Sequence, residues 1–333
     1  MQSQDVILVG AKGFWKERAR VRDILPAHTH LHFSDRLEID GERWKNVHAI
    51  VVADQKVGAS VMDKYPNLRT IARTGTGYDN VDVVEAKKRG VVVTRVAAIN
   101  AEATSEFALG LLFALSKHIV LLHTSMIQER WTRAYGIPIG DLTVGVIGLG
   151  HIGRALVRRL HQVGVKKILG WNRTQQRDEF RSLFLETEFE LVESVHELLI
   201  ESDAVIVAVA LTQETKGFIG EDSLARMKST AFLINVCRGA VVDEDALARY
   251  VAERKIGGVA LDVFSIEAPH DLELFQRPFM QSLLTSARNG YNVILTPHNA
   301  SVGRDTVELI SRQVAKNIEG VLSGNMEHVE VVP

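Results

Sequence analysis

Short runs of Val, Ile, Leu and Ala recur along the chain and alternate with longer stretches in which charged residues return every three or four positions. The runs are apolar throughout rather than at alternate positions, which predicts strands covered on both faces, as in parallel sheets flanked by helices. The sequence therefore predicts an α/β fold. The expected strands lie within residues 5–10, 48–54, 68–74, 91–96, 143–148, 166–171, 203–210, 230–236, 257–263 and 292–297.

The stretches between these runs have the pattern of amphipathic helices, as at residues 154–164 and 244–255. The most apolar stretch, residues 107–123, is interrupted by Lys117 and His118 and is too short for a membrane span, which needs about 20 apolar residues. We expect a buried helix there, covered by a second domain or by another subunit.

Composition limits the classes of function. The chain has 333 residues and a net charge of -2 from 39 basic and 41 acidic residues, so it lacks the basic surface of a nucleic-acid or membrane-binding protein. A length of this size favours two domains, and the expected ligand is small. A single cysteine, Cys237, excludes an internal disulfide framework and fits a reducing compartment. The first residues lack a basic signal-peptide region, so a cytoplasmic location is expected.

No metal site is expected. The segment HTHLH would place His28, His30 and His32 on one face of a strand, but no carboxylate or cysteine at a suitable spacing completes a ligand set. A solvated strand is the preferred interpretation.

Two glycine-rich turns could hold a phosphate. The turn RTGTGYDN has Asn80 where a third glycine would stand, so it is predicted to be an ordinary loop. The turn in TVGVIGLGHIGRALVRRL has Gly148, Gly150 and Gly153 between a strand pattern and an amphipathic helix, which is the dinucleotide-binding arrangement. The helix N-terminus offers free N–H groups and a positive dipole to the pyrophosphate.

The end of the next strand bears on the choice between NAD and NADP. An NAD enzyme usually has an acidic residue there for the ribose hydroxyls, whereas this chain has Asn172 followed by Arg173. Arg173 and Thr174, with Arg177, could donate to a 2′-phosphate, which favours NADP over NAD. The alternative is that Arg173 is an exposed surface residue and that Asn172 binds the ribose of NAD.

An arginine stands where another buried strand gives way to glycine, in the stretch INVCRGAVVDE. Arg238 could be a surface residue, a structural ion-pair partner or a cation for an anionic ligand. Ligands of open α/β sheets bind beyond the carboxyl ends of the strands, which favours the third interpretation. Asp243 is a predicted helix N-cap, so the chain should turn away directly after Arg238.

Two later strand ends add acid–base groups. Asp262 and Glu267 follow one buried strand, and His298 follows the next. Histidine exchanges a proton near neutral pH, and a carboxylate on its second nitrogen fixes the tautomer. An arginine for a carboxylate, a histidine for a carbonyl oxygen and a nicotinamide for hydride together predict reversible reduction of a 2-keto acid. Taken singly, Glu267 could be a loop charge and His298 a turn residue.

The chain resembles the D-isomer-specific 2-hydroxyacid dehydrogenases, which include phosphoglycerate dehydrogenases and glyoxylate or hydroxypyruvate reductases. The stretches that carry the resemblance are RTGTGYDNVD, NAEATSEFALGLLFAL, TVGVIGLGHIGR, INVCRGAVVDEDAL, LDVFSIE and TPHNAS, in that order. It implies that Arg238 binds substrate, Glu267 supports the histidine and His298 transfers the proton. It also implies cofactor contacts from Thr104, the backbone of His151 and Ile152, Thr215, the backbone of Val236 and Cys237, and Asp262, and substrate contacts from the backbone of Thr74, Gly75, Thr76 and Gly77.

The resemblance further implies two Rossmann-like domains. A discontinuous, flavodoxin-like substrate domain would comprise residues 1–100 and 299–333, and a dinucleotide-binding domain would comprise residues 101–298, with linking helices near 101–122 and 302–321. The family is usually dimeric, so a homodimer is expected.

Some features depart from the family pattern. The interval from Glu267 to His298, 31 positions, is longer than usual, and Phe275, Phe279 and Met280 within it could cover an apolar substrate. A lid, a dimer contact, a disordered loop and a plain surface insertion remain alternatives. Arg95 and Ala98 replace the usual residues before NAEATSE. Cys237 is interpreted as a packing residue rather than a nucleophile, because the reaction needs no thiol.

The predicted function is NAD(P)-dependent reduction of a 2-keto acid to the D-2-hydroxy acid. Two alternatives on the same fold are a corepressor-like protein that senses the dinucleotide and a phosphite- or formate-type dehydrogenase.

Overall fold

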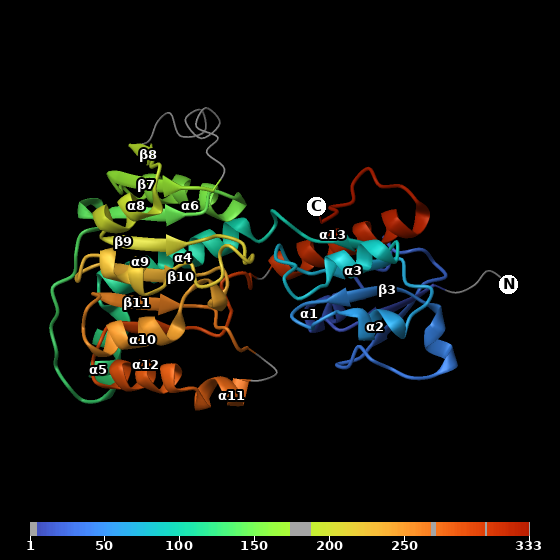
Figure 1. Cartoon of the computed structure of the whole chain (residues 1–333), viewed down its shortest axis with the longest axis horizontal. Helices are drawn as coiled ribbons and strands as arrows, with labels where there is room; N and C mark the ends of the chain where they lie inside the picture. The colour runs from blue at the N-terminus through green and yellow to red at the C-terminus, as the bar shows by residue number, and fades with distance from the viewer. Residues whose placement is uncertain (1–4, 174–187, 268–270, 304, 333) are drawn as a thin grey trace. The chain divides into compact units, whose positions relative to one another are not determined.

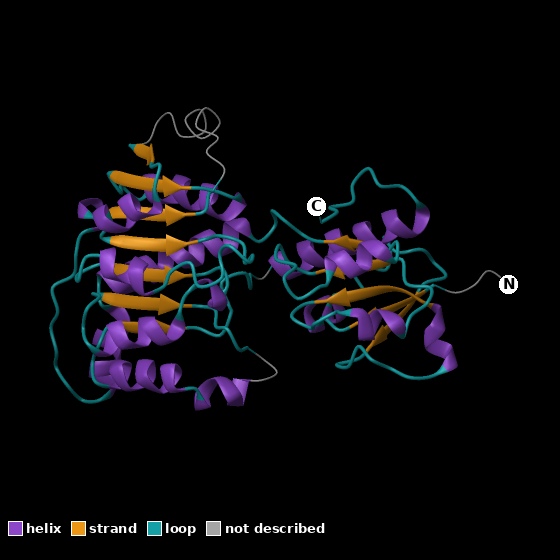
Figure 2. Ribbon diagram, viewed as in Figure 1, coloured by secondary structure: helices purple, strands orange, loops and turns teal. Residues whose placement is uncertain are grey.

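The computed structural model describes residues 5–173, 188–267, 271–303 and 305–332. The chain forms two compact units, residues 1–100 with 302–333, and residues 101–301. Each unit contains a parallel sheet with helices, as Figures 1 and 2 show, which confirms the predicted α/β class. The predicted domain boundary at 298/299 compares with 301/302 for the compact units.

The first unit has five parallel strands in the order β2-β1-β3-β4-β5. This is the flavodoxin-like order, in which the chain starts near one edge and then winds toward the other. The strands are β1 (Val6–Val9), β2 (His30–Phe33), β3 (Val47–Val52), β4 (Thr70–Arg73) and β5 (Val92–Thr94); the helices are α1 (Lys12–Lys16), α2 (Ala59–Asp63), α3 (Val83–Lys88) and α13 (Thr306–Ser323), with a 3₁₀ turn at Glu42–Asn46.

The second unit has seven parallel strands in the order β12-β11-β10-β9-β6-β7-β8. The strands are β6 (Thr143–Ile147), β7 (Lys167–Trp171), β8 (Phe189–Leu191), β9 (Ala204–Val207), β10 (Phe232–Asn235), β11 (Gly258–Leu261) and β12 (Val293–Leu295). The helices are α4 (Ala101–Ser116), α5 (Ile119–Ile127), α6 (His151–Gln162), α8 (Val195–Glu201), α9 (Glu221–Arg226), α10 (Glu244–Ala252), α11 (Asp271–Gln276) and α12 (Pro278–Arg288), with 3₁₀ turns at Ile139–Asp141 and Gly239–Val241.

Both faces of this second sheet are buried, as the apolar runs predicted. In β9, Ala204 and Ile206 pack into a core with α4 and α6, whereas Val205 and Val207 pack into a core with α8, α9, α10 and α12. Successive side chains of a strand point to opposite faces, so a strand with a helix layer on each side is apolar at every position.

The three strands β10, β11 and β12 are neighbours and run in the same direction. Their carboxyl ends therefore lie at one edge of the sheet, where Arg238, Asp262 and His298 follow them. The fold thus brings together residues that are up to 60 positions apart in the sequence.

The stretch 107–123 does not form the single helix that its composition predicted. Helix α4 ends at Ser116 and α5 begins at Ile119, with a bend of 63° between them and with His118 in the left-handed conformation at φ 53°. A non-glycine residue in that region interrupts the helical hydrogen-bond pattern. Among the described helices, none alone has the length and hydropathy of a membrane span, although α4 and α5 taken together meet that criterion.

The long interval after Glu267 forms helices α11 and α12 on the second unit. Phe279 and Met280 are buried in the core beside α10, so these two side chains stabilise the unit. Phe275, on α11, is 49% exposed.

Candidate functional site

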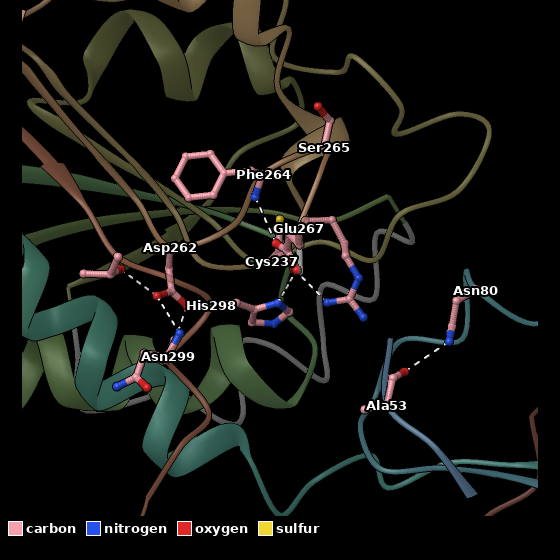
Figure 3. Close-up of polar contacts among 12 residues, drawn as sticks. Ala53, Asn80, Cys237, Asp262, Phe264, Ser265, Glu267, His298 and Asn299 are labelled. Carbon is pink, nitrogen blue, oxygen red and sulfur yellow. Dashed lines mark hydrogen bonds and ion pairs between the residues drawn. The ribbon is translucent and has the colours of Figure 1, made fainter. Parts of the chain in front are cut away.

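The loop that follows β12 is held by the carboxylate of Asp262, which is fully buried at the end of β11. Its Oδ1 accepts hydrogen bonds from the hydroxyl of Thr296 at 2.6 Å and the N–H of Asn299 at 2.8 Å, and its Oδ2 accepts from the N–H of Ala300 at 2.8 Å. Figure 3 shows the side chain of Asp262 beside His298 and Asn299. A buried carboxylate that accepts several hydrogen bonds fixes the groups around it, so Asp262 sets the course of residues 296–300.

His298 lies in the middle of this loop with an uncommon backbone conformation. Its φ is 51°, and its N–H donates to the carbonyl of Asp262 at 2.7 Å. Left-handed backbone in a residue other than glycine is often found where a side chain must point in one direction. Here the ring points to Glu267, with Nδ1 of His298 at 2.6 Å from Oε2 of Glu267 (Figure 3).

The second oxygen of Glu267 is also engaged. Its Oε1 accepts the N–H of Phe264 at 3.0 Å, so the carboxylate is fixed by its own turn as well as by the histidine. Burial disfavours its charged form most strongly, but the hydrogen bond and positive charge of His298, with the Phe264 N–H and the charge of Arg238, together lower the pKa of Glu267 below its ordinary value. Glu267 is therefore ionised at neutral pH.

An ionised Glu267 determines the tautomer of the histidine. A carboxylate can only accept, so Nδ1 of His298 carries the proton that it donates to Glu267. Nε2 is then the nitrogen that can exchange a proton with a ligand, and the carboxylate stabilises the ring when both nitrogens are protonated.

Arg238 follows β10 on the same edge of the sheet and is partly buried. One guanidinium nitrogen donates to the carbonyl of Cys237 at 2.8 Å, and the Arg238 carbonyl accepts from the side chain of Asn235 at 3.0 Å. The structure confirms Asp243 as the N-cap of α10, since its side chain accepts the N–H of Ala246 at 3.0 Å. The charge of Arg238 contributes to the lowered pKa of Glu267, so a cation and the Glu267–His298 pair lie at the same edge of the second unit.

The residue after Arg238 must be glycine. A Cβ on Gly239 would stand 2.0 Å from the backbone carbon of Phe264 and 2.3 Å from the nitrogen of Ser265. The Arg238 turn and the Glu267 turn are therefore in direct backbone contact.

The glycine-rich turn has the geometry of an anion site. Gly148 has φ 98°, and a Cβ on Gly153 would stand 1.9 Å from the Gly148 carbonyl oxygen, so both positions require glycine. Gly150 caps α6, no described atom lies within 4 Å of where its Cβ would be, and no side-chain hydrogen bond caps this helix among the described residues. The backbone at Gly150, His151 and Ile152 thus fits a pyrophosphate at the start of α6.

The residues expected to distinguish NADP from NAD make local contacts. Oδ1 of Asn172 accepts the N–H of Leu149 at 3.1 Å, so Asn172 supports the glycine-rich turn. The guanidinium of the exposed Arg173 lies 3.6 Å from the carboxylate of Glu214. Thr174 and Arg177 lie outside the described residues.

The other residues predicted to contact the cofactor differ in whether their polar groups already form hydrogen bonds within the chain. The hydroxyl of Thr104 is buried and has no hydrogen-bond partner among the described residues, which is consistent with a hydrogen bond to the cofactor. The hydroxyl of Thr215 donates to the carbonyl of Ala210 at 2.7 Å, and the Cys237 N–H donates to Oδ1 of Asn235 at 3.1 Å. Val236 is buried.

The loop at Thr74–Gly77 belongs to the first unit. The Thr74 N–H donates to the Val52 carbonyl at 3.0 Å and is therefore engaged, whereas no described residue accepts from the N–H groups of Gly75, Thr76 and Gly77. Beneath the loop, the buried guanidinium of Arg73 donates to the Gly77 carbonyl at 2.7 Å. Arg73 was not among the predicted site residues, although an arginine at the end of a buried strand is visible in the sequence.

The histidines of the segment HTHLH lie in and next to β2. Only His30 and His32 lie in β2, and Nε2 of His28 pairs with Asp5 at 3.1 Å. Among the residues described by the structure, no group of three or more His, Cys, Asp or Glu side chains could hold a metal ion.

Comparison with known proteins identifies related chains. A sequence model described as "D-isomer specific 2-hydroxyacid dehydrogenase, NAD binding domain" matches residues 109–300. A glyoxylate reductase of Pyrococcus horikoshii is 36% identical over 291 residues, which is 84% of this chain and 81% of that protein. A glyoxylate reductase of Korarchaeum cryptofilum is 35% identical over 303 residues, which is 87% of this chain and 86% of that protein.

Solved structures agree with these matches. A D-lactate dehydrogenase of Aquifex aeolicus in complex with NAD and lactic acid has a TM-score of 0.86 and 26% identity, and covers 98% of this chain and 99% of its own. An NADPH-dependent glyoxylate/hydroxypyruvate reductase of Sinorhizobium meliloti in complex with NADP and malonate has a TM-score of 0.79 and 29% identity. The match covers 96% of this chain and 94% of that chain.

Proposed function

The chain belongs to the D-isomer-specific 2-hydroxyacid dehydrogenase family, and we propose that it reduces a small 2-keto acid to the D-2-hydroxy acid, using His298 as the proton donor and Arg238 as the carboxylate-binding group. The contact of 2.6 Å between Nδ1 of His298 and Oε2 of Glu267 is the observation that carries the proposal. Relatives that act as glyoxylate reductases support the substrate class.

Arg238, His298 and Glu267 have different proposed roles, which follow from their charges. Arg238 offers a planar cation that can hold a carboxylate through two parallel hydrogen bonds. Nε2 of His298 donates a proton to the carbonyl oxygen of the substrate, and Glu267 stabilises the protonated ring before the transfer. When bound, the nicotinamide supplies the hydride, and in the reverse direction His298 accepts the hydroxyl proton.

The glycine-rich turn and the start of α6 would hold the pyrophosphate of the cofactor. We propose NADP as the preferred cofactor, because Asn172 brings no negative charge to the end of β7 and Arg173 brings a positive one. The contact between Arg173 and Glu214 opposes this preference unless the phosphate displaces the carboxylate. NAD binding through Asn172 is the alternative, and the cofactor contacts of Thr104, Thr215, Val236, Cys237 and Asp262 stay predictions.

We propose that the unit of residues 101–301 binds the dinucleotide and that the loop at Thr74–Gly77, in the other unit, binds the substrate. Within that loop, we propose that the N–H groups of Gly75, Thr76 and Gly77 bind the substrate. The N–H of Thr74 is left out because it donates to the carbonyl of Val52. A cytoplasmic location stays a prediction.

A homodimer is also part of the proposal. Only Ser125 of α5 is buried, and the adjoining segment exposes Trp131 at 80% and Tyr135 at 100%. A monomeric protein rarely exposes so many large apolar side chains in one stretch of chain, so we propose this surface as the contact with a second copy.

The proposed activity is tested by a matrix of NADH and NADPH against glyoxylate, hydroxypyruvate, and branched and aromatic 2-keto acids. We expect cofactor oxidation with at least one keto acid, a preference for NADPH, and a rate lower by about 10²–10⁴-fold in His298→Ala, the range for loss of a general acid. Arg173→Asp should shift the preference toward NADH. Dinucleotide binding without turnover on any of these acids would contradict the proposal and favour an interaction protein that senses the cofactor; turnover of phosphite or formate instead would favour the other alternative.

A further inference from the structure

A second carboxylate contacts the turn that carries Glu267. Glu244, the first residue of α10, accepts the N–H of Ser265 on its Oε1 at 2.8 Å and the Ser265 hydroxyl on its Oε2. Ser265 lies two positions before Glu267 and next to Phe264, whose N–H donates to Glu267 (Figure 3). Two carboxylates thus hold consecutive N–H groups of one turn.

Asp243, and not Glu244, provides the side-chain N-cap of α10. Asp243 already caps the helix through the N–H of Ala246. Glu244 instead reaches out of its helix with both oxygens to a single residue of another loop, so the contact fixes the turn rather than the helix.

The same turn also contacts the turn that carries Arg238. Its backbone at Phe264 and Ser265 lies against Gly239, directly after Arg238, with no space for a Cβ. A displacement of Ser265 would therefore move the residue after the carboxylate-binding arginine as well as Glu267.

We propose that Glu244 is a positioning residue, which holds Ser265 so that Glu267 stays in register with Nδ1 of His298. This inference rests on the proposed function, and it concerns a residue outside the set that we propose to contact substrate or cofactor. Small misplacement of a reacting group lowers rates strongly, and a carboxylate that orients a histidine must itself be held.

The surroundings of Glu244 fit a hydrogen-bonding role. Burial raises the pKa of Glu244 above its ordinary value, while the two Ser265 contacts and the charge of Arg277 act in the opposite direction and Asp245 adds to the increase. Arg277, between α11 and α12, belongs to the segment that is longer than usual in the family, so that segment brings a charge to this contact.

The test compares Glu244→Ala with Glu244→Gln. Glutamine can still accept the Ser265 N–H and can donate to its hydroxyl, whereas alanine loses both contacts. The readout is the NMR titration of His298 in protein labelled at its 12 histidines, assigned with His298→Asn. The titration midpoint of His298 should fall by about 0.5–1 unit in the alanine variant, because the imidazolium loses part of its carboxylate contact, and should change little in the glutamine variant.

Kinetics give a second readout. The alanine variant should lose about 10–100-fold in kcat, with little change in the affinity for NADPH, and glutamine should restore most of the rate. Ser265→Ala, which removes only the hydroxyl contact, should have a smaller effect in the same direction and decides the question if Glu244→Ala does not fold. Glu221→Ala is the matched control, because Glu221 also begins a helix, α9, but pairs with Arg249 at the surface.

A folded Glu244→Ala with an unchanged His298 midpoint, or a Glu244→Gln as impaired as the alanine variant, would overturn the proposal. If Glu244→Ala does not fold, an unchanged midpoint in Ser265→Ala would overturn it too. A wild-type protein that turns over no 2-keto acid would overturn the proposed function instead and would leave the NMR comparison valid.

Discussion

His298 and Glu267 are 31 positions apart in the chain, yet Nδ1 of the first lies 2.6 Å from Oε2 of the second. The contact exists because β11 and β12 are parallel neighbours whose carboxyl ends meet at one edge of the sheet. Because the carboxylate accepts the Nδ1 proton, we propose Nε2 as the nitrogen that exchanges a proton with the substrate.

Replacing Glu267 by glutamine should therefore impair the reaction without removing the side chain. A neutral amide stabilises the imidazolium less well, so we expect kcat/KM to fall by about 10²-fold and its pH optimum to move to lower pH. Measurement of pH–rate profiles for Glu267→Gln checks this. Glu273→Gln, on the exposed side of α11, should behave like wild type; an unshifted optimum in Glu267→Gln would argue against the pair as the acid–base group.

Replacing Arg238 by lysine should separate charge from geometry. Lysine keeps the positive charge but cannot offer the paired donors of a guanidinium, so KM for the keto acid should rise by about 10-fold or more while NADPH binding is retained. Steady-state kinetics and fluorescence titration of NADPH measure the two effects. Arg226→Lys, at the exposed end of α9, is the control. Equal loss of keto-acid and cofactor binding in Arg238→Lys would show that Arg238 has a structural role only.

The Glu267 contact also predicts a pH dependence of stability. The pKa of Glu267 is lower in the folded chain than its ordinary 4.5, despite the opposing effect of burial, so ionised Glu267 stabilises the fold at pH values above 4.5. That contribution is lost as the pH falls below 4.5 and through the lowered pKa. Thermal unfolding between pH 7 and pH 3 should therefore show a smaller decrease of Tm in Glu267→Gln than in wild type. Parallel curves for the two proteins would contradict this assignment.

Cys237 should be inert in the folded protein. Burial raises the pKa of its thiol to about 11, although the nearby Arg238 acts to lower it, and the side chain is 8% exposed. A thiol reagent at pH 8 should thus react slowly with the native chain and rapidly after unfolding in guanidinium chloride. Cys237→Ala should keep most of the activity, since no step uses the thiol; complete loss of activity in a folded variant would show otherwise.

If α5 forms the dimer contact, a charged substitution on its exposed surface should weaken dimerisation. Ile127 is 69% exposed, and Ile127→Asp should weaken self-association by about 10-fold or more, because a charge would be buried in an apolar contact. Sedimentation velocity at several concentrations measures this. Val84→Asp is a matched control on α3 of the other unit, where the residue is 68% exposed. Equal behaviour of the two variants would place the contact elsewhere.

The sequence predicted the elements that are long or fully apolar and missed the rest for physical reasons. All ten apolar runs overlap strands, and β2 overlaps the segment HTHLH, which is interpreted as a solvated strand. Strand β8 was missed because its sequence Phe-Glu-Leu has a charged residue at its centre and lacks the signal of a buried strand. The break between α4 and α5 depends on one residue, His118, whose left-handed backbone is not visible in a hydropathy pattern.

Candidate site residues can be named from the sequence where chemistry is concentrated in a motif. Arg238, Glu267 and His298 follow predicted strands and could be named from residue type and position. The contacts of Asp262 with residues 296–300, and of Glu244 with Ser265, join segments that become neighbours only in the folded sheet. No local pattern signals such pairs, because each partner taken alone is an ordinary loop or helix-start residue.

Residues 101–301 form an uninterrupted stretch of chain, whereas the other unit is assembled from two separate segments. A single recombination event that exchanged this stretch between two genes would transfer the arginine, the glutamate and the histidine together, with every backbone contact that orients them. The loop at Gly75–Gly77 would stay behind with the recipient. New combinations of the two units could thus arise by shuffling one block of coding sequence, without rebuilding either unit.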